Sequence, residues 1–146
     1  MEGKELKEKV YFCGSIRAGR DDQPIYEALA KHLTEHYGPV LTQHVAQKVQ
    51  QCDIAATEKE IHDRDIAWLR ESTSVVAECT QPSLGVGYEL GFAVWLEKPT
   101  LVLYRPADGK RLSAMIAGQD KFTVCEYHTV EEGIAAIDAF YAKLRA

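Results

Sequence analysis

Apolar residues gather in five short runs that are rich in β-branched and aromatic side chains. The runs are VYFCGSI (10–16), PVLTQHV (39–45), SVVAEC (74–79), PTLVLYR (99–105) and FTVCEYH (122–128). Runs of this length and composition predict strands. The run SVVAEC is apolar on both sides of such a strand, which indicates a sheet that is covered on both faces.

Between these runs and after the last one, a second pattern recurs every three or four positions, as on one face of a helix. The faces are Ile25, Leu29, His32 and Leu33; Ile61, Asp65, Trp68 and Leu69; and Ile134, Ile137, Tyr141 and Leu144. Strands that alternate with helices call for right-handed crossovers between parallel strands. We therefore predict an α/β fold with a doubly wound, five-stranded parallel sheet in the flavodoxin-like Rossmann order 2-1-3-4-5.

Length and composition fit a single domain. The chain has 146 residues, 46% of them hydrophobic, and contains no internal repeat or linker. We expect one domain over residues 1–146, with residues 1–9 as a flexible lead-in. The net charge of -5 offers no basic field for a polyanion, which argues against a nucleic acid polymer as partner.

The chain also lacks the features of a membrane or secreted protein. No apolar segment approaches the roughly 20 residues that span a bilayer, so we expect no membrane association. The charged N-terminus has no apolar signal-peptide core. Four cysteines form no C-x-x-C pair. Buried, reduced thiols indicate the cytoplasm, with the nucleus as a further location.

The predicted winding reverses between the first and third strands, where doubly wound sheets bind ligands. The loops GSIRAGR (14–20) and TQPSLGVGYE (80–89) meet there. The first offers hydroxyl and guanidinium donors that suit a phosphate, although a solvated turn with surface arginines is the alternative. In the second, Ser83, Gly85 and Gly87 precede a helix whose free N–H groups favour an anion. A glycine-rich helix start selected for close packing is the alternative there.

Gly85 and Gly87 begin a G-x-G-x-x-G fingerprint, but Leu90 occupies the place of the third glycine. The glycines also follow the third strand instead of the first, so a dinucleotide oxidoreductase is the least favoured interpretation. Glu89 lies in the first turns of the helix. It is either a partner of the helix dipole or, kept ionised by that dipole, the nucleophile of a retaining glycosyl transfer.

A glycosyl transfer also needs a group that protonates the leaving base. Asp65 is a candidate because it shares the apolar face of its helix; a hydrogen-bonded structural aspartate is the alternative. Tyr11 either packs in the core or brings its hydroxyl to the end of the first strand. The five histidines form no H-E-x-x-H or similar set, so we predict neither a metal nor a cofactor.

Four segments together resemble one known family. YFCGSIR (11–17), IHDRDIAWL (61–69), TQPSLGVGYELG (80–91) and LSAMI (112–116) are similar to the 2'-deoxynucleoside 5'-phosphate N-hydrolases of the nucleoside 2-deoxyribosyltransferase superfamily. The resemblance implies hydrolysis of a small-molecule 2'-deoxynucleoside 5'-monophosphate to free base and 2-deoxyribose 5-phosphate. It implies Glu89 as the nucleophile that forms a covalent glycosyl intermediate, Asp65 as acid and then base, and Tyr11 as the residue that orients Glu89.

The resemblance further implies a homodimer in which Ser113 reaches the neighbouring site. It places phosphate contacts at Ser15, Arg17, Ser83 and the backbone of Gly85, with His44 near the base or sugar. Met115 is expected near the active site across the dimer interface. The full set of predicted substrate-binding residues is Gly14, Ser15, Ile16, Arg17, Arg20, His44, Ser83, Gly85, Ser113 and Met115.

Two other functions remain open. One is a nucleoside 2-deoxyribosyltransferase, which passes the sugar to a second base, and the other is a non-catalytic nucleotide-binding module. The sequence Arg17-Ala18-Gly19, where vertebrate members resemble R-G-G, and the loop 48–59 depart from the family pattern and leave the base preference open. A 2'-hydroxyl destabilises an oxocarbenium-like state, so we expect a preference for deoxyribose.

Overall fold

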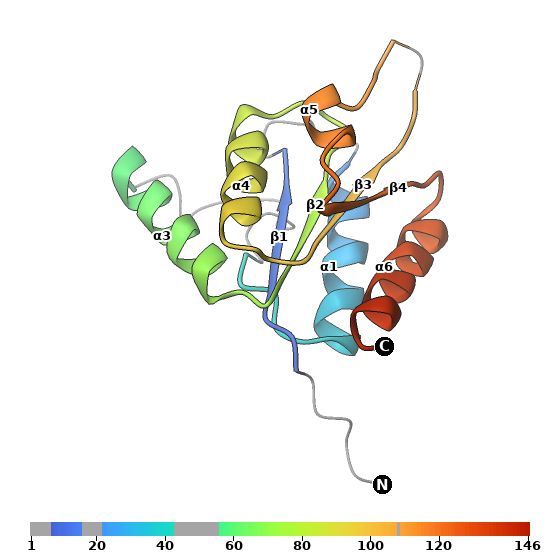
Figure 1. Ribbon diagram of the computed structural model, residues 1–146, viewed down its shortest axis with the longest axis horizontal. Helices are drawn as coiled ribbons and strands as arrows, with labels where there is room; N and C mark the ends of the chain where they lie inside the picture. The colour runs from blue at the N-terminus through green and yellow to red at the C-terminus, as the bar shows by residue number, and fades with distance from the viewer. Residues whose placement is uncertain (1–6, 16–21, 43–55, 108) are drawn as a thin grey trace, which may run out of the picture.

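The computed structural model describes residues 7–15, 22–42, 56–107 and 109–146. Four strands form its sheet: β1 (Val10–Gly14), β2 (Ser74–Glu78), β3 (Thr100–Tyr104) and β4 (Phe122–Glu126). They lie in the order β1-β2-β3-β4, and every pair is parallel (Figure 1). All residues of β1 and β2 are buried, as expected for strands covered on both faces. The α/β class and the parallel sheet are therefore confirmed.

The predicted count of five strands is wrong for the described residues. In the run 39–45, only Val40 pairs with the sheet, through a single parallel bridge to Val10 at the outer edge of β1. Next to it, the Thr42 hydroxyl bonds with both the N–H and the carbonyl oxygen of Phe12. Because a side chain occupies the backbone groups that a fifth strand would use, the ladder ends there. Residues 43–45 lie outside the described residues.

Helices cover both faces of the sheet (Figure 1). On one face, α1 (Gln23–His36) and α6 (Val130–Leu144) lie side by side; on the other are α3 (Glu58–Glu71) and α4 (Leu84–Trp95), while the short α5 (Ala114–Ala117) precedes β4. Because side chains alternate along each strand, the core consists of two clusters, one on each face of the sheet. Phe12 packs with the α1 and α6 cluster, whereas Tyr11 and Cys13 pack with Leu69 of α3 and Leu90 of α4.

Side-chain caps fix where three of the helices begin. Thr57, Ser83 and Thr129 each accept a hydrogen bond from the backbone N–H three residues later. Such caps satisfy N–H groups that have no partner inside the helix. The start of α4 is therefore set by Ser83, one of the residues predicted to bind substrate.

Part of the predicted flexible lead-in is tied to the sheet. Of residues 1–9, the structure describes 7–9, and the amide of Glu8 donates to the carbonyl oxygen of Tyr37 at 3.0 Å. The amide of Lys9 donates to Thr73 Oγ1 at 2.9 Å. The approach is close, because a Cβ on Gly38 would lie 1.8 Å from the Glu8 carbonyl oxygen. No helix in the described part of the chain is long and apolar enough to cross a membrane.

Candidate active site

A tyrosine and a glutamate meet between β1 and α4. Tyr11, whose side chain is almost completely buried, points toward the α4 side of the sheet. Its hydroxyl donates to Glu89 Oε2 at 2.5 Å. The sequence left the direction of Tyr11 open, and the structure shows its hydroxyl on the carboxylate of Glu89.

Asp65 extends from α3 toward the same place. Its carboxylate is about one-fifth exposed and accepts from Arg64, with both Nε and Nη2 2.9 Å from Oδ1. The Asp65 charge raises the pKa values of both Glu89 and Tyr11, so the three predicted catalytic residues lie within electrostatic reach of each other. The Arg64 guanidinium also lies 4.9 Å from the centre of the Trp68 ring. The sequence analysis did not identify Arg64 as part of this site.

Burial dominates the electrostatics of Glu89. Loss of solvent raises its pKa from 4.5 to about 7, and Asp65 adds to this effect, whereas the Tyr11 hydrogen bond acts in the opposite direction. A pKa of about 7 favours the protonated form well above the usual pH, which runs against the expectation that the helix dipole keeps Glu89 ionised. The physical reason is that the dipole field is strong only in the first turn, and Glu89 lies beyond it. Burial and Glu89 also raise the pKa of Tyr11, which therefore stays a neutral donor.

The start of α4 brings a hydroxyl close to this carboxylate. Ser83 Oγ accepts from the N–H of Val86 at 3.2 Å, and its own hydrogen can still be donated to a ligand. A Cβ placed on Gly85 would lie 3.8 Å from Ser83 Oγ and 3.9 Å from Glu89 Oε1. The glycine thus leaves open the space between a helix N-terminus that favours anions and the predicted nucleophile.

The first loop is described only at its beginning. Gly14 ends β1, and Ser15 follows it as a buried residue. A Cβ on Gly14 would lie 3.0 Å from the Tyr26 ring, so this position has no room for a side chain. The other predicted residues Ile16, Arg17, Arg20 and His44 lie outside the described residues.

Two thiols border the site. Cys13 is buried on the same side of β1 as Tyr11, and Cys79 follows β2. Burial raises the pKa of Cys79 to about 12 and that of Cys13 well above its usual value, so both thiols are neutral and unreactive. Among the described residues, no group of three His, Cys, Asp or Glu side chains is arranged to hold a metal ion.

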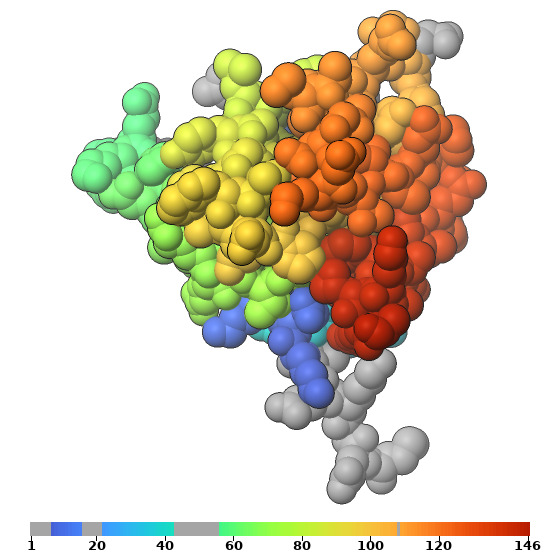
Figure 2. Space-filling model, in the orientation of Figure 1, coloured from blue at the N-terminus to red at the C-terminus, as the bar shows by residue number. Residues whose placement is uncertain are grey.

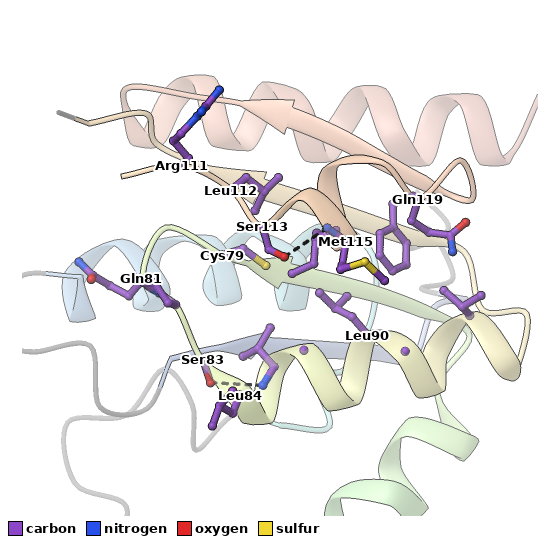
Figure 3. A pocket seen from close by; sticks show the side chains of 17 residues that line it. Cys79, Gln81, Ser83, Leu84, Leu90, Arg111, Leu112, Ser113, Met115 and Gln119 are labelled. Atoms are coloured by element: carbon purple, nitrogen blue, oxygen red, sulfur yellow. Dashed lines mark hydrogen bonds between the residues drawn. The ribbon is translucent and has the colours of Figure 1, made fainter. Parts of the chain in front are cut away.

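An open groove of about 820 Å³ separates α4 from the segment that leads into α5. Ser83 and Ser113 lie on its opposite walls in Figure 3, and Ser113 caps α5 by accepting from the N–H of Met115. Figure 2 shows α4 and α5 next to each other on this face of the molecule. Leu84 and Met115 on its rim are 96% and 85% exposed. Apolar side chains this exposed are typical of an interaction surface.

Comparison with known proteins shows that the chain is similar to one enzyme family. The model of the nucleoside 2-deoxyribosyltransferase family matches residues 10–129. A 5-hydroxymethyl-dUMP N-hydrolase from Mus musculus is 53% identical over 124 residues, covering 81% of this chain and 71% of that protein. The enzyme of the same name from Homo sapiens is 46% identical over 137 residues, covering 90% of this chain and 76% of that protein.

A solved structure shares the fold at much lower sequence identity. The CMP N-glycosidase from Clostridium botulinum superposes with a TM-score of 0.69 and 17% identity, covering 90% of this chain and 99% of that chain. At this identity the similarity establishes the fold alone.

Proposed function

Because this chain belongs to the nucleoside 2-deoxyribosyltransferase family, we propose that it hydrolyses the N-glycosidic bond of 2'-deoxynucleoside 5'-monophosphates to free base and 2-deoxyribose 5-phosphate. The observation that carries the proposal is the part-buried hydrogen bond from Tyr11 to Glu89, with the Ser83-capped start of α4 beside it. A carboxylate oriented by a hydroxyl suits attack on a sugar carbon, and the helix start suits a phosphate.

In the first step, ionised Glu89 attacks C1' of the sugar. The bond from C1' to the base nitrogen breaks, its electron pair stays on the base, and Asp65 supplies the proton that the departing base needs. Glu89 is then esterified to the sugar. A geometry with two carboxyl groups in the same site supports this division of roles.

In the second step, water attacks C1' and displaces the Glu89 carboxylate. Asp65 now takes the proton from the water, which returns both residues to their starting states. Tyr11 orients the Glu89 carboxylate for its attack in the first step and stabilises the carboxylate that leaves in the second step. Its raised pKa supports this role, because the hydroxyl keeps the proton that it donates to Glu89.

The 5'-phosphate is held by Ser15, Ser83 and the backbone N–H of Gly85, with the predicted donors Arg17 and Arg20 of the first loop. Its binding energy positions C1' against Glu89 and lowers the barrier at a bond remote from the phosphate. The open space at Gly85, between Ser83 Oγ and Glu89 Oε1, supports a substrate that spans both groups. The mammalian relatives are named for 5-hydroxymethyl-dUMP, so this nucleotide belongs in any substrate panel.

We also propose that the chain is one domain that works as a homodimer. The groove between α4 and α5 supports a second subunit there, because Leu84 and Met115 are exposed apolar side chains that line it. Gly87 and Gly91 have open space where a Cβ would lie, which would let another backbone approach α4 closely. In such a dimer, Ser113 of one subunit completes the phosphate site of the other.

Chromatography of free base released from a panel of deoxynucleoside and ribonucleoside monophosphates tests the proposal. We expect base release from deoxynucleotides, its loss in Glu89→Gln, and a large reduction in Asp65→Asn. Glu126→Gln is the matched control, because Glu126 also accepts from a tyrosine, Tyr104, at 2.6 Å but is exposed on β4. Equal kcat/KM for ribonucleotides would contradict the deoxy preference.

Adding a different free base to the same reaction distinguishes hydrolysis from transfer. A hydrolase gives only base and sugar phosphate, whereas a transferase gives a new nucleotide. If every substrate binds but none is cleaved, and Glu89→Gln binds equally well, the protein is a nucleotide-binding module instead.

A further inference from the structure

A second buried charged group lies on the opposite face of the sheet, at the carboxyl ends of β2 and β3. It consists of Asp22, Glu78 and Arg105, which we name the acid-arginine clamp. Asp22 is 4% exposed and Glu78 is completely buried. Arg105 Nη2 pairs with the Asp22 carboxylate, and Nη1 lies 3.9 Å from Glu78 Oε2. Nothing in the proposed reaction uses these residues.

Glu78 forms the fixed side of the clamp. Its carboxylate accepts from both the N–H and the hydroxyl of Thr80, at 2.7 and 2.9 Å, and from the Tyr127 hydroxyl. The Arg105 guanidinium lies 5.6 Å from the centre of the Tyr127 ring. These contacts join the ends of β2, β3 and β4 to each other and, through Asp22, to the start of α1.

Asp22 connects the clamp to the start of α1, because it is the residue that directly precedes this helix. Aspartate is a favoured helix cap, yet the Asp22 side chain makes no capping bond to α1. It reaches instead to Arg105, 83 residues away. Its second oxygen, Oδ2, is buried without a hydrogen-bond partner among the described residues. Among the described residues, the link therefore comes with the loss of a side-chain cap and with a buried oxygen that has no hydrogen-bond partner, and both are costly.

The link fixes the segment that begins the predicted phosphate site. Gly14 and Ser15 lie at one end of the loop, where Gly14 packs against Tyr26 of α1. Asp22 lies at the other end. We propose that Asp22, Arg105 and Glu78 are positioning residues that hold the start of α1, and with it Ser15, in the geometry that binds the 5'-phosphate. The inference rests on the proposed function in that it takes the phosphate to bind at this loop.

The physical argument is pre-organisation. A donor such as Ser15 that is already held in place loses less conformational freedom when its ligand binds. Two buried carboxylates that share one arginine would not be favoured for stability alone, since apolar residues of similar volume usually serve as well. Ligands bind in doubly wound sheets at this carboxyl edge, where exact placement of polar groups matters.

Phosphate-dependent binding gives a test that general destabilisation does not mimic. A deoxynucleoside monophosphate and the matching deoxynucleoside are titrated by calorimetry against Glu89→Gln protein, which blocks turnover. We expect Asp22→Asn and Arg105→Lys to weaken monophosphate binding by about 10-fold or more and to leave nucleoside binding unchanged. Arg105→Lys keeps the charge but loses the two-pronged contact, so it covers the case in which Asp22→Asn does not fold.

The matched control is Asp138→Asn. Asp138 also accepts from a tyrosine, Tyr37, at 2.5 Å and pairs with His32 at 2.7 Å, but it lies at the far end of α1 and α6. We expect no change in phosphate discrimination in this variant. An equal loss for both ligands, or the same loss in Asp138→Asn, would overturn the proposal and leave the clamp a purely structural feature.

Amide hydrogen exchange in the first turn of α1 tests the clamp without any ligand. We expect faster exchange there in Asp22→Asn than in Asp138→Asn, and equal exchange would refute the anchoring. The two proposals fail differently. If the wild type binds monophosphate but releases no base, the proposed function fails while the clamp stands; if hydrolysis is normal and discrimination survives in the variants, the clamp fails alone.

Discussion

Replacing Glu89 by glutamine should abolish hydrolysis and at the same time stabilise the folded protein at alkaline pH. Burial raises the pKa of Glu89 from 4.5 to about 7. The difference of about 2.5 pH units corresponds to about 3.5 kcal/mol, at about 1.4 kcal/mol for each unit. This is the free energy that ionisation of Glu89 removes from folding once the pH exceeds both values. A neutral glutamine of the same shape avoids it and can still accept from Tyr11.

The sign follows from the two pKa values. Below pH 4.5 the carboxyl is neutral in both the folded and the unfolded state, so it contributes no pH-dependent term. As the pH rises from 4.5 to about 7, the unfolded state loses the proton while the folded state keeps it, and stability falls. Above pH 7 the full cost is present. Glu89→Gln should therefore gain little at pH 4 and about 3 kcal/mol at pH 8 relative to the wild type.

Urea unfolding at pH 4 and pH 8, at one fixed protein concentration, measures this difference. Glu126→Gln is again the control, because its carboxylate is exposed and should show no such gain. A glutamine variant that is equally stable relative to wild type at both pH values would refute the reasoning. The same pKa predicts that kcat/KM of the wild type rises with pH through about 7, as the nucleophile becomes ionised.

The remaining predictions concern the partners of Glu89 and the groove. Tyr11→Phe removes a hydrogen bond that lowers the pKa of Glu89, so the rise of kcat/KM should move above pH 7; an unmoved profile would contradict this. Asp65→Asn should reduce kcat by about 10²–10⁴-fold. It should also shift the pH profile of kcat/KM to lower pH, because the charge of Asp65 raises the pKa of Glu89. Steady-state kinetics across pH measures both effects, and an unchanged kcat or an unshifted profile would contradict the prediction. Leu84→Asp should leave the fold intact and give an inactive monomer, which sedimentation and base release measure together; an active dimer would rule out the proposed interface.

Much of the fold follows from local patterns, and its one error has a local cause. The runs at 10–16, 74–79, 99–105 and 122–128 all contain strands, because runs rich in β-branched and aromatic residues favour a strand even in β4, where most residues are exposed. The run at 39–45 has a similar composition. What ends its pairing after Val40 is the side chain of Thr42, whose hydroxyl takes the backbone groups of Phe12. Composition does not reveal where a threonine hydroxyl will point.

The site could be predicted in its members but not in its electrostatics. Helix faces and strand alternation left Asp65 and Tyr11 open, and only the resemblance to a known family predicted them as a set with Glu89. The protonation of Glu89 depends on how much solvent α3, α4 and β1 jointly exclude, and no spacing along the chain reports that. Arg64 escaped notice because neighbours at adjacent helix positions do not normally face each other. The link from Asp22 to Arg105 joins residues 83 positions apart, with no pattern that connects them.

The two faces of the sheet affect the ionisation of Glu89 and the placement of the phosphate in different ways. On the α4 side, a carboxylate must be ionised to react, yet it lies in a buried space beside Asp65 and close to where an anionic phosphate is proposed to bind. Each of these conditions favours the protonated form, and the Tyr11 hydroxyl opposes them. Donors that hold the phosphate in one place therefore also protect the reactivity of Glu89, because a phosphate that drifted toward the carboxylate would raise its pKa further. Firm anchoring on the α1 side would therefore have two effects. It would keep the phosphate tightly bound, and it would keep Glu89 in the ionised form that reacts.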